Sequence, residues 1–151
     1  MASEGRTAMF LGEHQHALDA KGRVILPARF RERLADGAFL SRLHDGCLAV
    51  YPPEEFEVVA QEMKEKARRG PAERQAARAF FAGTVDVVPD RQGRIPIPPH
   101  LREFAGLERD VMVNGVYDRV ELWDAERWRA LEREAGPRSA QSDSVLSDLG
   151  I

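Results

Sequence analysis

The sequence has very little cysteine, with Cys47 as the single thiol among 151 residues. One thiol cannot form an intramolecular disulfide, and such sparse use of cysteine is typical of proteins kept in a reducing compartment. No apolar run approaches the roughly 18 residues that a membrane-spanning helix needs, and residues 1–8 lack the apolar segment of a secretory signal. We therefore expect a cytoplasmic protein without a membrane partner.

An excess of positive charge is also missing, because 22 Lys and Arg residues face 25 Asp and Glu residues and the formal net charge is −3. The charges are nevertheless segregated along the chain. Residues 21–33 contain five basic residues and the single acid Glu32, whereas acids concentrate over residues 54–65 and 121–134. Such an acidic chain can still bind nucleic acid through its basic segment if the acidic segments face away.

An internal repeat is the most informative pattern that the sequence does contain. The stretches Asp19-Ala-Lys-Gly-Arg23 and Asp90-Arg-Gln-Gly-Arg94 share Asp, Gly and Arg at a constant separation of 71 residues. Residues 10–12 match 81–83 at the same separation, and residues 39–51 match 111–123 after a slip of one residue. A fixed separation inside one short chain indicates a duplicated module.

A module of about 45 residues rarely buries enough apolar surface to fold alone. We therefore expect the two copies to share one core about a pseudo-two-fold axis, in an α+β fold with a β-barrel-like, mainly antiparallel sheet and peripheral helices. The expected organisation is a first module over residues 13–56, a helical linker over 57–83, a second module over 84–127 and a disordered, Ser- and Asp-rich tail over 137–151.

Hydrophobic spacing and turn residues define the expected elements. After a loose leader over residues 1–8, strands are expected at residues 9–18, 24–26, 38–43, 47–51, 84–88, 94–97, 110–115 and 118–123. Helices are expected at residues 28–35, 52–69, 72–81, 99–105 and 125–134.

Each repeated loop contains an arginine that loop geometry does not require. The opening aspartate can accept backbone N–H bonds in a turn, and Gly22 and Gly93 can supply a positive φ. Arg23 and Arg94 have no such role. Their guanidinium forks suit a phosphate or the O6/N7 edge of guanine, although each could instead pair with its own loop aspartate and stiffen the turn. The residues alone leave both interpretations open.

Further basic residues lie on or just behind the loops: Lys21, Arg91, Arg29, Arg31 and Arg33. The three arginines on the helix over residues 28–35 are compatible with an ordinary solvated face. Together with the loops they are also compatible with a phosphate-contacting patch.

The two Asp-x-x-x-Arg loops each lead into a proline-started helix, and the copies end in Tyr51-Pro52 and in Glu121-Leu-Trp-Asp124. In these features the chain resembles the MraZ family over residues 9–134. The resemblance implies a bacterial transcription regulator, a repressor, built from two SpoVT/AbrB-like modules. It places the DNA-reading surface on residues 19–23 and 90–94.

The same resemblance implies a ring-shaped homo-oligomer that binds short spaced repeats in double-stranded DNA upstream of the division and cell-wall gene cluster. Association with the nucleoid follows, and no cofactor or small-molecule substrate is implied. Two positions depart from the first copy, because Gln92 replaces Lys21 and His100 replaces Arg29. The second loop is therefore expected to hold DNA less strongly than the first.

Two other classes of function have some support in the sequence. An enzyme or metal protein draws support from His14 and His16 on one face of a strand, with His44 or Glu13 as further ligands. No His-x-x-Glu or Cys-pair spacing accompanies these histidines, so we expect no metal. The nucleophile candidates Cys47 and Ser41 lack an assignable base, so we expect no catalysis. An antitoxin-like protein-interaction module is the remaining alternative, although two fused modules are not typical of one.

Overall fold

The computed structural model describes residues 9–135 and 140–151, so the leader expected over residues 1–8 lies outside the described residues. The strands are β1 (Phe10–Ala17), β2 (Arg23–Ile25), β3 (Ala38–Arg42), β4 (Leu48–Tyr51), β5 (Val85–Val87), β6 (Arg94–Pro96), β7 (Asp110–Tyr117) and β8 (Arg119–Asp124). The helices are α1 (Ala28–Leu34), α2 (Pro53–Ala67), α3 (Pro71–Gly83), α4 (Pro99–Ala105), α5 (Ala125–Ala135) and α6 (Ala140–Asp148). The expected elements are present with bounds that shift by at most two residues, and α6 is additional.

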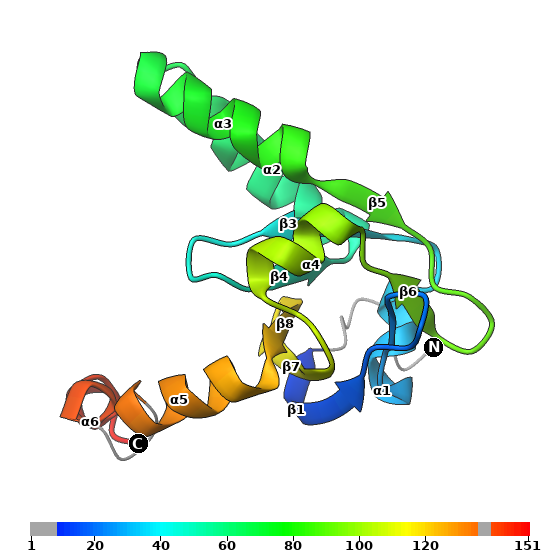
Figure 1. Cartoon of the computed structure of the whole chain (residues 1–151). Coiled ribbons are helices and arrows are strands. Elements are labelled where there is room, and N and C mark those ends of the chain that lie inside the picture. Colours follow the sequence, from blue (N-terminus) through cyan, green and yellow to red (C-terminus); the bar gives the residue numbers. More distant parts are fainter. Residues whose placement is uncertain (1–8, 136–139) are drawn as a thin grey trace, which may run out of the picture.

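Six strands form one antiparallel sheet in the order β1-β7-β8-β4-β3-β5, while β2 and β6 pair in a separate two-stranded ribbon (Figure 1). The two halves of the chain interleave, because β1, β3 and β4 come from the first half and β5, β7 and β8 from the second. Within the described residues no pairing joins the edge strands β1 and β5. The mixed α+β class is confirmed, but closure into a barrel is not seen, because β2 and β6 bond to each other instead of extending the sheet.

One core lies between a face of this sheet, the ribbon, α1 and α4. Alternate residues of β8, Val120 and Leu122, point into it, and α1 contributes Phe30 and Leu34 from positions four apart. The ribbon contributes Val24 from the first half of the chain and Ile95 from the second, and all of these side chains are buried. The expectation that the two halves share one core is therefore confirmed.

The opposite face of the sheet is covered in part by α5. Trp128 of this helix lies against Trp123 of β8, with 5.5 Å between ring centroids. The indole Nε1 of Trp123 donates a hydrogen bond of 3.0 Å to Glu121 Oε1, and Arg119 pairs with the second oxygen of the same carboxylate at 2.6 Å. Both carboxylate oxygens of the buried Glu121 therefore have a partner.

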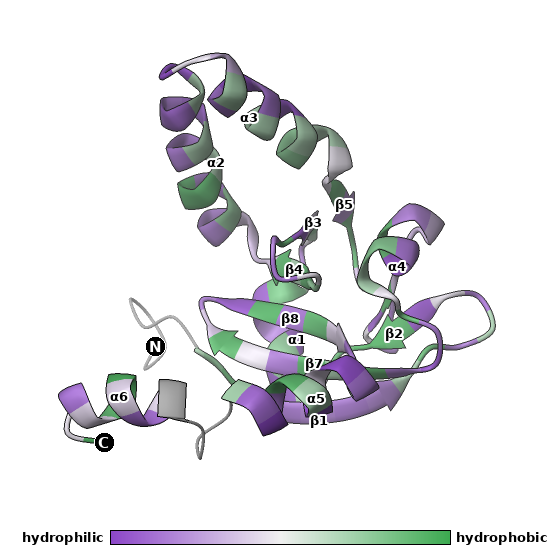
Figure 2. Cartoon of the chain, turned by 60° about the vertical axis from the view of Figure 1, so that its left-hand side comes forward, coloured by the Kyte–Doolittle hydropathy of each residue, from purple (hydrophilic) through white to green (hydrophobic). Residues whose placement is uncertain are grey.

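Helices α2 and α3 form a hairpin that stands away from the sheet and carries apolar residues on both helices (Figure 2). At its base Phe56 stacks on Phe39 of β3, with 4.4 Å between centroids, and on Phe80 of α3 at 6.1 Å. No residue of α2 is buried, and α3 buries Ala77 and Gly83 alone. The hairpin therefore leaves much of its apolar surface uncovered.

The tail differs from the expectation of disorder, because residues 140–148 form α6. Residues 136–139, which belonged to that expectation, lie outside the described residues. This Ser- and Asp-rich segment also contains the apolar residues Val145, Leu146 and Leu149. Their spacing can place them on one face of a helix. Ser142 Oγ also donates a hydrogen bond of 2.7 Å to the carbonyl of Ala135 at the end of α5.

The module boundaries expected at residues 13–56 and 84–127, with a linker at 57–83, stay a prediction. In the described part of the chain, no helix is both long enough and apolar enough to cross a membrane.

Candidate nucleic-acid interface

The β2–β6 ribbon places the two repeated arginines on one outward face. Val24 lies opposite Ile95 in the register, and both side chains point inward and are fully buried. The neighbouring positions therefore point outward, since side chains alternate along a strand. Arg23 lies opposite Pro96, and Arg94 lies opposite Ile25.

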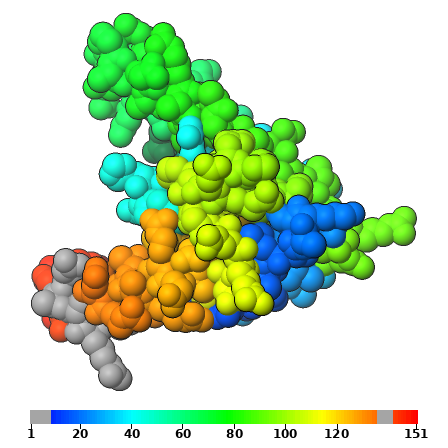
Figure 3. Space-filling model, in the orientation of Figure 1, coloured from blue at the N-terminus to red at the C-terminus, as the bar shows by residue number. Residues whose placement is uncertain are grey.

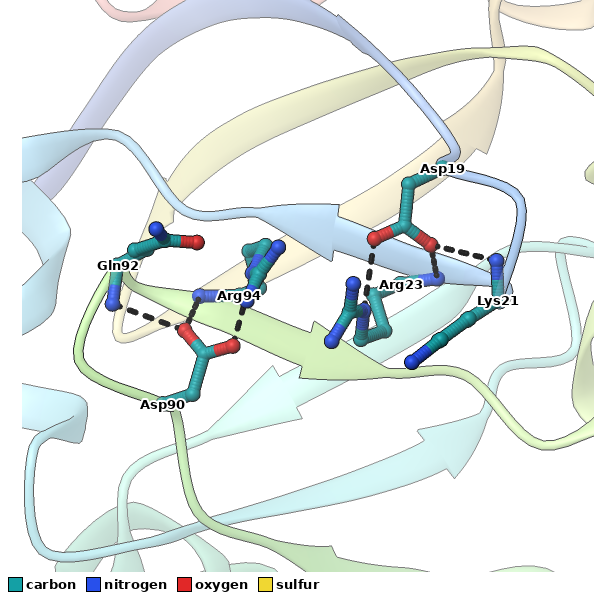
Figure 4. A network of polar contacts seen from close by, with 6 residues as sticks. All are labelled: Asp19, Lys21, Arg23, Asp90, Gln92 and Arg94. Carbon is teal, nitrogen blue, oxygen red and sulfur yellow. Dashed lines mark hydrogen bonds and ion pairs between the residues drawn. The ribbon is translucent and has the colours of Figure 1, made fainter.

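Loop 1, residues 19–23, is organised by a single carboxylate. Asp19 Oδ1 accepts the backbone N–H groups of Lys21 and Arg23, both at 2.9 Å, and Oδ2 accepts Arg23 Nε at 2.7 Å (Figure 4). Two backbone bonds close the turn, from Asp19 N to Arg23 O at 2.9 Å and from Gly22 N to Asp19 O at 3.0 Å. Gly22 has a φ of +75°, as expected from its place in the turn.

Loop 2, residues 90–94, repeats this geometry. Asp90 Oδ1 accepts the N–H groups of Gln92 and Arg94 at 2.9 Å, and Oδ2 accepts Arg94 Nε at 2.8 Å (Figure 4). Gly93 has a φ of +82°. Loop 2 also protrudes from the body of the protein, away from the α2–α3 hairpin (Figure 3).

Both loop aspartates are held in their charged form. The backbone N–H of Arg23 is the main reason that the pKa of Asp19 lies below its usual range, and the guanidinium of the same residue adds to the effect. Arg94 lowers the pKa of Asp90 in the same way. The carboxylates therefore remain acceptors at neutral pH and keep the loops closed.

Each arginine pairs with its own aspartate, yet it uses only Nε to do so. Within the described residues no hydrogen bond occupies the two terminal nitrogens of Arg23 or Arg94. The side chains are 26% and 31% exposed, respectively. The pairing that the stiffened-turn interpretation expects is thus present. It is compatible with nucleic-acid contact as well, since a guanidinium fixed at Nε can still offer its terminal fork to a planar acceptor pair.

Two further arginines brace the loops crosswise. The guanidinium of Arg31, on α1, lies against Gly93 of loop 2, and that of Arg102, on α4, lies against Gly22 of loop 1, so closely that a Cβ at either glycine would overlap it. Arg31 Nε also donates a 2.9 Å hydrogen bond to Leu26 O. Sequence reasoning missed Arg102, although it follows Arg31 by the same 71 residues that separate the two loops.

The remaining basic residues divide into two groups. Lys21 and Arg91 are exposed on the loops, and Arg29 is exposed on α1. Arg33 lies elsewhere, because its guanidinium pairs with Glu54 at 2.9 Å and Glu55 at 3.5 Å on α2. Its side chain is only 10% exposed. The geometry thus gives Arg33 a structural contact and does not bring it to the ribbon face.

The residues considered for catalysis or metal binding do not converge. His14 packs edge-on against Phe30, with 5.3 Å between centroids, and burial lowers the pKa of His16. Burial raises the pKa of Cys47 to about 12, so that its thiol is a poor nucleophile. Ser41 Oγ shares a 2.8 Å hydrogen bond with Thr84 Oγ1. The described residues contain no group of three or more His, Cys, Asp or Glu placed to hold a metal ion.

Comparison with known proteins agrees with the repeat. A family model described as "MraZ protein, putative antitoxin-like" matches the chain twice, over residues 9–79 and 80–148. The relative from Salinispora tropica is 46% identical over 93% of this chain and 100% of its own length. That from Paenarthrobacter aurescens is 45% identical over 91% and 97%, and that from Heliobacterium modesticaldum is 43% identical over 95% and 100%.

Each of these relatives is named "Transcriptional regulator MraZ". Their class is therefore that of transcription regulators. With two matches of the family model and relatives of this similarity along almost its whole length, the chain belongs to the MraZ family.

Proposed function

We propose that this protein is a DNA-binding transcription regulator, without catalytic activity, whose β2–β6 ribbon reads double-stranded DNA. The observation that carries the proposal is the pair of outward-facing arginines, Arg23 and Arg94. Each is fixed at Nε by a loop aspartate and has no hydrogen bond on its terminal nitrogens within the described residues. A two-stranded ribbon fits the major groove, where a guanidinium can bind O6 and N7 of guanine in a bidentate manner.

The proposed division of labour follows from exposure. Arg23 and Arg94 contact bases, while the exposed Lys21, Arg91 and Arg29 contact phosphates and set the position on the duplex. Arg31 and Arg102 keep the two glycine turns in shape from behind.

Two SpoVT/AbrB-like modules related by a pseudo-two-fold axis are part of this proposal. The sheet order supports such an axis, because exchanging β1 with β5, β3 with β7 and β4 with β8 reverses the order and leaves it otherwise unchanged. The equivalent residues Val24 and Ile95 also lie opposite each other in the ribbon.

A single ribbon makes few phosphate contacts and should bind weakly at physiological salt. We therefore propose that the protein works as a ring-like homo-oligomer, in which several ribbons engage spaced repeats and the second contact gains from effective concentration. The proposed role is that of a repressor, associated with the nucleoid, at repeats upstream of its own division and cell-wall gene cluster.

The test is a salt titration of binding to DNA from upstream of its own gene, with scrambled DNA as the competitor. Replacing both Arg23 and Arg94 by Ala should remove the preference for the cognate sequence, because each bidentate pair is worth about 1–3 kcal/mol of discrimination. Arg29→Ala is the matched control. It should weaken binding to the cognate and the scrambled DNA alike and reduce the slope of the salt dependence by about one unit.

Retained discrimination in the double variant would remove the ribbon from its proposed role. If the wild type bound neither DNA at low salt, the alternative of an antitoxin-like protein-interaction module would be favoured. The exposed apolar surface of the α2–α3 hairpin gives that alternative its structural support.

A further inference from the structure

The α2–α3 hairpin and the adjacent β3–β4 turn enclose an uncovered apolar hollow of about 590 Å³. Val59 and Met63 of α2, Ala76 and Phe80 of α3 and Phe104 of α4 contribute most of its apolar wall. Phe104 is 39% exposed, and Ala76 is exposed as well. Exposed surface of this kind is characteristic of an interaction site.

The charged rim of the hollow is basic. Arg42 and His44 line it, and no carboxylate does so among its lining residues. Arg42 is held in place by a 2.9 Å hydrogen bond to the carbonyl of Ala79 and lies 5.7 Å from the ring of Phe104. A partner that is apolar on one face and carries acids would therefore complement this hollow.

Helix α6 and the residues that follow it have these properties. Val145 of α6 is 61% exposed, and Leu149 and Ile151, which come after the helix, are 67% and 82% exposed. Its only charged residues are Asp143 and Asp148. The helix has nine residues, about 14 Å in length, and the helices of the hairpin have 15 and 13 residues, so α6 fits beside them.

The fold separates α6 from the hollow of its own chain. Helix α5 leads the chain away from the sheet, and α6 lies at the opposite end of the molecule from the hairpin (Figures 1 and 2). The side chain of Ser142 is bonded to the end of α5, which keeps the start of α6 there. A second copy of the chain can offer its α6 without such a restriction.

We propose that α6 of one protomer docks in the hollow between the α2–α3 hairpin and the β3–β4 turn of the next protomer. Val145 and Leu149 then cover the apolar wall, and Asp143 and Asp148 approach Arg42 and His44. The contact joins two different surfaces, so it repeats from copy to copy and closes a ring when the rotation permits. This inference rests on the proposed homo-oligomer and names the surfaces that build it.

The test is crosslinking between two singly substituted full-length proteins, Leu149→Cys and Ala76→Cys, mixed in solution. A short thiol crosslinker should yield a covalent heterodimer of the two variants. The controls are Ser147→Cys in place of the first and Ala82→Cys in place of the second. Ser147 is an exposed residue of α6 two positions before Leu149, and Ala82 is an exposed residue of α3 that does not line the hollow. The native Cys47 is buried and should contribute little background.

A heterodimer yield no higher than in the controls would overturn the proposal. A protein that carries both Leu149→Cys and Ala76→Cys could also crosslink only within one chain, independently of concentration. That result would overturn the proposal and place α6 in the hollow of its own chain. A second measurement is light scattering of Val145→Glu/Leu149→Glu, which should lose the oligomer that Ser147→Glu retains. An oligomer unchanged by the double variant would equally refute the contact.

These outcomes are separate from those of the DNA experiment. If the interface proposal fails, discrimination by Arg23 and Arg94 is untouched. If the DNA proposal fails, the crosslink between residues 149 and 76 still forms.

Discussion

Asp19 and Asp90 each perform two tasks with one carboxylate. Oδ1 gathers two backbone N–H groups and sets the shape of the loop, while Oδ2 fixes the arginine four residues later. The arginine is thereby oriented before any ligand arrives, which reduces the entropy lost when it binds. Neutralising the carboxylate should therefore affect both the loop and the orientation of the arginine.

The first prediction concerns the double variant Asp19→Asn/Asp90→Asn. The native state lowers the pKa of both carboxyls, so their contribution to stability is present above their unfolded-state pKa, about 3.9, and is lost as the pH falls through the lowered native values. Urea unfolding should give the variant a lower free energy of unfolding than the wild type at pH 7. This difference should shrink below about pH 4.

A matched control for this prediction is Arg91→Gln, which changes the charge of loop 2 without changing a carboxylate. Its difference in free energy of unfolding from the wild type should not disappear at acid pH. An equal gap between wild type and double variant at pH 7 and pH 3.5 would mean that the charge of the carboxylates does not stabilise the loops.

At the scale of the elements, sequence spacing predicts the strands and helices because apolar periodicity and proline-started helices act locally. The aspartate, glycine and arginine of each loop are predicted for the same reason. The contacts of Arg31 with loop 2 and of Arg102 with loop 1 are not predicted, because the sequence does not say which loop a helix will contact. Arg33 was misplaced because its partners, Glu54 and Glu55, follow it by some twenty residues, and α6 was missed because its polar composition outweighed its apolar spacing.

The second prediction concerns the anchoring of α4, whose Leu101 is fully buried in the shared core. Leu101→Ala should lower the free energy of unfolding by about 2–5 kcal/mol, since it removes buried contacts and leaves a cavity. The same substitution at Leu131 of α5, which is 37% exposed, should cost less than about 1 kcal/mol. Denaturant titrations at one protein concentration would compare them, and equal losses would contradict the placement of α4 in the core.

For the whole molecule, segregation of charge reconciles a net charge of −3 with a basic ribbon face. The acids of α2 lie on the protruding hairpin, while Lys21, Arg23, Arg91 and Arg94 lie on the ribbon and its loops. If the proposed function is right, DNA at the ribbon should meet little repulsion from the acids of α2, because charges act over roughly 10 Å at 0.1 M salt.

The third prediction uses Cys47, which is buried beneath the α5 face of the sheet and whose pKa is raised to about 12 by burial. At pH 8 the native thiol should react with an aromatic disulfide reagent on the order of a thousandfold more slowly than an ordinary cysteine, because so little thiolate is present. A Ser147→Cys variant supplies an exposed thiol for comparison, and equal rates at the two positions would show that Cys47 is accessible.

The crossed braces have a consequence for the history of this chain. After most duplications one copy can drift while the other preserves the original role. Here Arg31 supports a glycine of the second half, and Arg102 supports a glycine of the first. A substitution in either half therefore affects a loop of the other half. We expect the two copies to evolve together, so that neither copy is free to drift.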